Sequence, residues 1–160
     1  MNYSTCFTNK LLTILFSLLL TGVVHATPVL ELKLNGDFDF NYDQVRQSLE
    51  DHRFFVVFEP NIGNSLSHFK ERWGEDYNRN GYENIRSLVF CNPWYANKVI
   101  NLDPEMSALC PLSVTLLHKK GSTQLMFLRP SQIKPDSPAQ AILEELEADI
   151  LKALKSSGAE

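Results

Sequence analysis

The sequence predicts an α+β fold, with a single, mostly antiparallel sheet and helices packed on one face. Two observations predict it. Short apolar runs typical of strands alternate with segments of helical period along most of the chain, and two β-rich runs near its end flank a polar turn that contains glycine. The second arrangement indicates a hairpin. Because a hairpin requires antiparallel pairing, we expect the helices to cover one face of an antiparallel sheet.

The first predicted elements are a strand, a helix and a second strand. Apolar side chains alternate at residues 29–34 and stop at the turn signal of residues 35–37. A helix capped by Asn41 or Asp43 follows. The unbroken apolar run at residues 54–58 is too short for a helix, so we expect a strand that is buried on both faces.

The middle of the chain predicts a helix, a loop and a third strand. Residues 61–73 have helical spacing that places Phe69 and Trp73 on the buried side. The polar segment 75–83 is typical of a loop, and a strand is expected at residues 85–91.

Proline ends this third strand, because Pro93 cannot donate a hydrogen bond to a neighbouring strand. A third helix is expected at residues 94–102, with one more helical turn at residues 105–109.

The last predicted elements are the hairpin and a long helix. The hairpin strands lie at residues 112–118 and 123–128. The C-terminal helix at residues 137–155 has a broad apolar stripe, with acidic residues early and lysines late, as the helix dipole favours. From Ser156 we expect a frayed tail.

The N-terminal segment predicts export. Residues 1–26 combine a weakly cationic start at Lys10, an apolar stretch and a small-residue exit that ends at Ala26. The apolar stretch is shorter than the roughly 18 residues of a spanning helix, so a retained anchor is the weaker alternative. We therefore expect cleavage after Ala26, a single domain over residues 27–160, a periplasmic or secreted location, and no stable membrane anchor.

Composition limits the class of partner. Without residues 1–26 the chain keeps 134 residues, enough for one domain with its own hydrophobic core. Its 14 lysines and arginines face 19 acidic residues, a formal charge of −5. This balance argues against nucleic acid as a partner.

Two cysteines remain after Cys6 is removed with the signal: Cys91 and Cys110. In an exported chain, one structural disulfide is the default interpretation. The two cysteines flank a helical excursion of 18 residues, which in an antiparallel sheet returns the chain beside its exit point. In the loop-entropy description, such a bond stabilises the fold by about 3 kcal/mol.

Other roles for the cysteines stay open. A thiol-redox accessory role is weaker, because no C-x-x-C motif and no neighbouring cation favour a thiolate. A metal site would combine the thiols with Met106, Met126 or His118, a set that suits Cu(I) or Zn(II) but has no recognised spacing. The motif for covalent haem, C-x-x-C-H, does not occur, and no cofactor is expected, while a metal- or haem-carrying periplasmic protein stays an alternative.

Catalysis has no support in the sequence. There is no Gly-x-Ser-x-Gly motif, no convincing order of Ser, His and Asp, no phosphate-binding loop and no dinucleotide fingerprint. We therefore expect no catalytic residues, and the sequence favours a binding protein over an enzyme.

Between Phe40 and Pro130 the chain resembles the family called domain of unknown function 302, DUF302. The resemblance rests on the motifs Phe54-Phe55-Val56-Val57-Phe58, Phe90-Cys91-Asn92-Pro93, Asp103-Pro104-Glu105, Leu109-Cys110-Pro111-Leu112-Ser113-Val114 and Arg129-Pro130. It implies a family-like core at residues 40–130, followed by the C-terminal helix, and a sheet with helices on one side, similar to half of the TATA-binding-protein fold. It also implies pairing through the sheets, and hence a homodimer.

One position departs from the family pattern. The family commonly has proline before the second cysteine, whereas here Pro111 follows Cys110. A shift of one residue on a strand turns a side chain to the opposite face. From this order alone, whether Cys110 meets Cys91 stays open.

The leading hypothesis is an exported, non-enzymatic binding or interaction domain. Its partner would be a small apolar ligand or a periplasmic protein. The candidate binding surface lies at the strand ends beside the two cysteines and consists of Asn92, Pro93, Trp94, Tyr95, Pro111 and Ser113.

Overall fold

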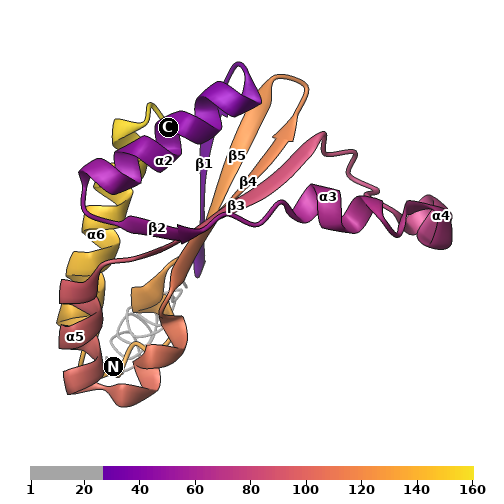
Figure 1. The fold of residues 1–160 in the computed structure, drawn as a ribbon. Helices are drawn as coiled ribbons and strands as arrows, with labels where there is room; N and C mark the ends of the chain where they lie inside the picture. The colour runs from indigo at the N-terminus through magenta and orange to yellow at the C-terminus, as the bar shows by residue number, and fades with distance from the viewer. Residues whose placement is uncertain (1–26) are drawn as a thin grey trace, which may run out of the picture.

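The structure is a computed structural model and describes residues 27–160 (Figure 1). The predicted signal peptide lies outside the described residues. The helices and strands, with 3₁₀ helices labelled η, are β1 (Val29–Asn35), α2 (Phe38–Asp51), β2 (Phe55–Phe58), α3 (Ile62–Ser67), α4 (Lys70–Trp73), η1 (Gly74–Asp76), β3 (Asn84–Cys91), α5 (Pro93–Leu102), η2 (Pro104–Leu109), β4 (Leu112–Lys119), β5 (Ser122–Leu128), η3 (Pro130–Gln132) and α6 (Gln140–Ser156).

Five strands form one antiparallel sheet in the order β1-β5-β4-β3-β2. The predicted hairpin is present as β4 and β5, in which Val114 lies opposite Phe127 and His118 lies opposite Thr123. β1 pairs with the far edge of β5, and β2 pairs with β3. The predicted α+β fold with one antiparallel sheet is therefore confirmed.

One face of the sheet is covered by α2, α5 and α6, which lie together on the same side (Figure 1). Alternate positions of the three central strands point toward these helices and are at most 1% exposed: Leu88, Phe90, Val114, Leu116, Leu125 and Phe127. Val45 and Leu49 of α2 and Leu143 and Ile150 of α6 complete this core. The two-residue period of the strands and the helical stripes thus supply one shared apolar layer.

The opposite face of the sheet has a mixed surface. We call it the open sheet face and define it as Val89, Ser113, Thr115, Leu117 and Met126, which are half-buried or exposed. The strand register makes these residues neighbours across β3, β4 and β5. No helix among residues 27–160 is both long and apolar enough to cross a membrane.

The expectation of a strand buried on both faces at residues 54–58 was wrong. β2 is an edge strand that pairs only with β3, and its register shifts between Val56 and Phe58. Phe55, Val57 and Phe58 are 48%, 60% and 63% exposed, and only Phe54, just before the strand, is buried. An apolar run specifies a strand but does not say how many neighbours the strand will have.

The segment between β2 and β3 also differs from expectation. A single helix with Phe69 and Trp73 on its buried side was expected, but α3 ends at Ser67 and α4 begins at Lys70. Both aromatic rings are exposed and stack on each other, with centroids 5.0 Å apart. Figure 1 shows α3 and α4 extending away from the layer formed by α2, α5 and α6. The apolar spacing therefore forms a local aromatic pair instead of a core contact.

The C-terminal tail is ordered, contrary to the frayed tail expected from Ser156. Gly158 has a φ of 92°, which lets the chain turn back after α6. Ala159 is buried, and Glu160 exchanges two backbone hydrogen bonds with Lys33 of β1, at 2.8 and 3.0 Å. The tail therefore adds a short extra pairing to the outer edge of β1.

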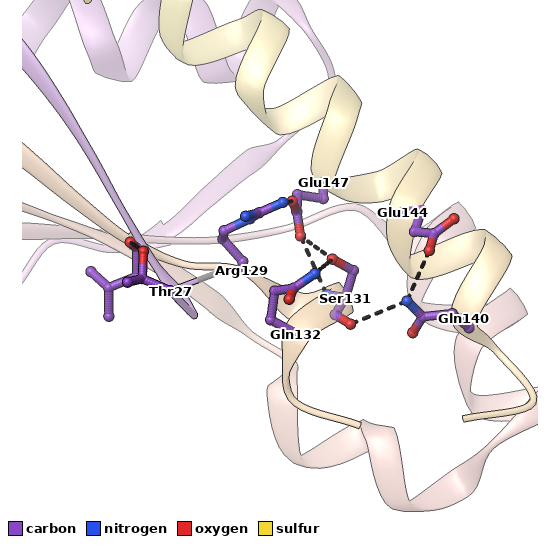
Figure 2. Close-up of polar contacts among 8 residues, drawn as sticks. Thr27, Arg129, Ser131, Gln132, Gln140, Glu144 and Glu147 are labelled. Carbon is purple, nitrogen blue, oxygen red and sulfur yellow. Dashed lines mark hydrogen bonds and ion pairs between the residues drawn. The ribbon is translucent and has the colours of Figure 1, made fainter. Parts of the chain in front are cut away.

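A buried carboxylate fastens the end of β5 to α6 (Figure 2). Glu147 is 5% exposed, and its Oε1 accepts a hydrogen bond from Arg129 Nε at 2.7 Å. Its Oε2 accepts one from Ser131 Oγ at 2.5 Å and one from the Ser131 backbone N–H at 3.3 Å. Both carboxylate oxygens are thus satisfied, as a buried charge requires.

Replacing this carboxylate should destabilise the protein. Glu147→Ala leaves the partly buried Arg129 guanidinium without its partner, so we expect the free energy of unfolding to fall by about 3 kcal/mol. Urea denaturation followed by circular dichroism measures the change. The matched control is Glu144→Ala on the exposed side of the same helix, with an expected change within about 0.5 kcal/mol. Equal losses in the two variants would contradict the role assigned to Glu147.

Candidate functional site

The candidate site lies where β3 ends and β4 begins. Phe90 pairs with Leu112, so the chain leaves the sheet after β3 and returns to it at the same end. Asn92 caps the helix that follows: its side-chain oxygen accepts hydrogen bonds from the backbone N–H groups of Trp94, at 3.0 Å, and Tyr95, at 3.3 Å. Pro93 occupies the first turn, where its missing N–H costs nothing.

The return path is fixed by a polar cluster at Asp103. This residue is buried and caps η2 by accepting from the Glu105 backbone N–H at 3.2 Å. Ser137 Oγ and Lys134 Nζ also donate to its carboxylate, at 2.7 and 3.0 Å. These bonds, first that of Ser137 and then that of Lys134, lower the pKa of Asp103. The cap therefore holds η2, and with it Met106, against the segment that precedes α6.

The two cysteines meet at this end of the sheet. Cys91 Sγ and Cys110 Sγ lie 3.4 Å apart as two free thiols. This separation is a contact between thiols and exceeds the roughly 2.05 Å of a disulfide bond, so the predicted disulfide is not formed here. The order Cys110-Pro111, joined by a cis peptide bond, does not prevent the two side chains from meeting.

The two thiols differ in environment. Cys91 is half-buried, whereas Cys110 is exposed. Burial, assisted by the hydrogen bond with the Cys110 thiol, raises the pKa of Cys91 to about 11. Cys91 is therefore held as a neutral thiol at physiological pH, and solvent reaches the pair through Cys110.

A narrow apolar pocket lies beneath the cysteines. We call it the strand-end pocket; it encloses about 30 Å³. It is lined by Phe90, Cys91, Asn92, Tyr95, Ala96, Val99, Ile100, Met106, Ser107, Leu109, Cys110, Leu112, Pro130, Leu143 and Leu146. Two wider depressions, of about 260 and 350 Å³, lie elsewhere and are lined mainly by polar residues. Of these three hollows, the strand-end pocket is the one that combines apolar walls with two thiols.

The two neighbouring aromatic residues of the predicted surface, Trp94 and Tyr95, lie in different environments. Tyr95 is buried in the pocket wall, and its hydroxyl donates to Asp149 Oδ2 at 2.6 Å. Burial and then this bond raise the Tyr95 pKa, so the hydroxyl stays protonated. Trp94 is half-exposed on the surface, where Lys98 Nζ lies 3.6 Å from the centre of its ring. Tyr95 therefore belongs to the pocket, and Trp94 belongs to the surface beside it.

The structure gathers some of the other candidate residues and separates the rest. Pro111 is exposed next to Cys110, and Ser113 lies on the open sheet face. Met106 is buried and lines the pocket with both cysteines. His118 lies at the other end of β4, where its Nδ1 is 2.8 Å from Thr123 Oγ1.

Other pocket residues were not singled out from the sequence. Leu143 and Leu146 of α6 form one wall, and Ala96, Val99 and Ile100 of α5 form another. The helical stripes did identify several of them as apolar, but nothing in the sequence indicates that these two stripes face the cysteines. Within residues 27–160 there is no group of three or more His, Cys, Asp or Glu side chains that could hold a metal ion.

Comparison with known proteins identifies the family. The family described as domain of unknown function DUF302 matches residues 30–157. This chain belongs to the DUF302 family. The match extends the resemblance found in the sequence to nearly all of β1 and to the whole of α6.

A solved DUF302 structure has the same fold. The chain is similar to the crystal structure of an uncharacterized conserved DUF302 protein from Bacillus stearothermophilus, with a TM-score of 0.69 and 16% sequence identity. The similarity covers 82% of this chain and 99% of that chain. No curated protein matches the sequence. At this level of identity the likeness shows the fold alone, so an argument for function has to come from the site.

Proposed function

We propose that this DUF302 protein is an exported binding domain whose ligand site is the strand-end pocket. The observation that carries the proposal is the lining of this pocket, which is mainly apolar and includes two free thiols in contact at its edge. Apolar walls with a few convergent polar groups are typical of ligand sites. Export rests on residues 1–26, which have the pattern of a secretory signal.

The dimensions of the pocket limit its ligand. A space of about 30 Å³ accommodates only one or two water molecules, so a bound group must be slender and must displace side chains as it enters. Ile100 lines the pocket and is 40% exposed on α5, and exposed side chains change rotamer readily. The ligand class that fits is an alkyl chain, carried either by a small molecule or by a partner protein as an apolar side chain.

A disulfide between Cys91 and Cys110 is part of the proposal. The S–S bond forms as each thiol gives up one proton and one electron, and these two electrons and two protons convert a disulfide of an exported thiol oxidoreductase to two thiols. The two sulfurs are 3.4 Å apart, so they need only a short further approach to reach bonding distance. In this state the bond would join the end of β3 to the start of β4 and stabilise the edge of the pocket.

A thiol-redox role is the second candidate. The exposure of Cys110 favours it, because an accessible sulfur can be attacked by another thiol. The reduction potential separates the two roles: a structural bond lies below about −300 mV, and a working redox pair lies well above that value.

A homodimer formed through the sheet is the proposed assembly. The open sheet face supports it, since valine, leucine and methionine side chains gather there among small hydroxyl residues. A second copy presents the same surface, and a two-fold arrangement lets one patch contact itself.

The pocket predicts saturable binding of a slender apolar probe. Titration of n-hexanol should shift the methyl NMR signals of Leu143 and Leu146, and Ala96→Phe, which fills the pocket from α5, should weaken binding at least tenfold. The control Ala148→Phe places the same ring on the exposed side of α6 and should bind as the unaltered protein does. Absence of saturable shifts in the unaltered protein would refute the pocket as a ligand site.

The disulfide predicts a stability that depends on reductant. Protein recovered from its export compartment should be two mass units lighter than its reduced form, and reduction should lower the free energy of unfolding by about 3 kcal/mol. The double variant Cys91→Ser, Cys110→Ser serves as the control and should show no effect of reductant. Free thiols in freshly exported protein would count against the disulfide.

The dimer predicts sensitivity to charge on the open sheet face. Met126→Glu, on that face opposite Thr115, should shift the protein from dimer to monomer in native mass spectrometry, because each copy would bury an unpaired carboxylate in the interface. Lys152→Glu, exposed on α6, is the control and should leave the dimer intact. A monomeric unaltered protein would rule out this assembly.

A further inference from the structure

Three sulfur-bearing side chains line the strand-end pocket. Two come from η2, where Met106 lies within the helix and Cys110 is its C-cap, and the third, Cys91, ends β3. The two thiol sulfurs are 3.4 Å apart, and Met106 is 5% exposed. Met126, on the open sheet face, is not part of the pocket lining. The fold thus brings Cys91 to the pocket that Met106 and Cys110 also line, so one pocket carries three soft donors.

The chemistry of these donors selects among metals. Thiolate and thioether sulfurs are soft ligands that favour Cu(I), whereas carboxylate and carbonyl oxygens suit hard cations. A structural Zn(II) site needs four ligands from Cys, His or carboxylate side chains. Within the described part of the chain, no group of even three such residues exists. A site of two thiolates and one thioether therefore fits Cu(I) and does not satisfy Zn(II).

We propose that the reduced strand-end pocket binds one Cu(I) ion through Cys91, Cys110 and Met106. The ion enters from the side of the exposed Cys110, and the buried Met106 supplies the third donor from within the pocket. Both thiols release their protons to solvent, and the copper remains in the +1 state throughout. The surrounding leucine and valine side chains exclude water from the inner side of the ion.

The elements that carry the ligands are held by interactions outside the ligand set. Asn92 fixes the turn directly after Cys91. Asp103, held by Ser137 and Lys134, fixes the start of η2, and its carbonyl oxygen accepts a hydrogen bond from the Met106 backbone N–H at 3.1 Å. These hydrogen bonds position the backbone beside Cys91 and Met106 and so limit where the two sulfurs can lie.

Copper binding and the disulfide are alternative states of the same two sulfurs. When the two sulfurs form a disulfide, no thiolate remains to donate an electron pair to Cu(I). Only the reduced protein can therefore bind the ion. The copper proposal does not depend on binding of an apolar ligand, because it uses the pocket edge and Met106 and leaves the walls formed by α5 and α6 unchanged.

The test is an anaerobic competition for Cu(I) between the reduced protein and the chromogenic chelator bicinchoninate. We expect one copper per protein chain, with complete loss of binding in Cys91→Ser and in Cys110→Ser. Met106→Leu keeps the volume of the side chain, and it should weaken binding by at least about tenfold. Met126→Leu is the matched control and should compete as the unaltered protein does. X-ray absorption at the copper edge should show three sulfur neighbours.

Specific results would overturn the proposal. Copper retained after replacement of both cysteines would place the ion elsewhere, and unchanged affinity in Met106→Leu would remove the thioether from the site. Zn(II) binding that is as tight as Cu(I) binding, or tighter, would contradict the preference of these soft sulfur ligands for Cu(I). The reduced and folded state of each variant is checked by thiol titration and circular dichroism, so a loss of copper is not confused with unfolding or with disulfide formation.

Discussion

The direct pairing of Phe90 with Leu112 is the constraint on which the rest of the site depends. Because these two residues are opposite each other in neighbouring strands, everything between them must leave and re-enter the sheet at one end. That excursion forms α5 and η2, and it places Cys91 and Cys110 on the two sides of the exit. The meeting of the cysteines is therefore a consequence of strand register, and no direct attraction between them is needed.

The pocket exists because α6 closes over this excursion. Glu147 contributes to the closure from within the helix, since it accepts hydrogen bonds from Arg129 and Ser131 on either side of Pro130. Pro130 and the α6 residues Leu143 and Leu146 all line the pocket. Glu147, which does not itself line the pocket, thus helps to hold the pocket residues of α6 and Pro130 in place. The polar residues of this region hold the walls, while the residues that face the pocket are mostly apolar.

The sequence predicted those parts of the fold that depend on local patterns. The β4–β5 hairpin follows from two alternating runs around a glycine turn, and the contact between the cysteines follows from the strand, helix, strand order. The errors concern residues whose surroundings are decided at long range. Phe55 and Phe58 form a strand as their β propensity indicates, yet they lie at an edge because the order of strands places β2 last. Phe69 and Trp73 have the spacing of a buried stripe, but their rings stack on each other and do not pack against the core. Met106 has no local signal that distinguishes it from Met126, and only the folded chain separates a pocket residue from one on the open sheet face.

The backbone pairing between Lys33 and Glu160 has a consequence for how this protein meets other chains. A sheet with free edges can add strands from its neighbours and grow into aggregates. Here the tail occupies part of the outer edge of β1, and the opposite edge, β2, offers only four residues with an interrupted register. Continuous strand addition is thereby hindered at both margins. In the proposed association through the open sheet face, side chains rather than backbone groups would determine which partner is accepted.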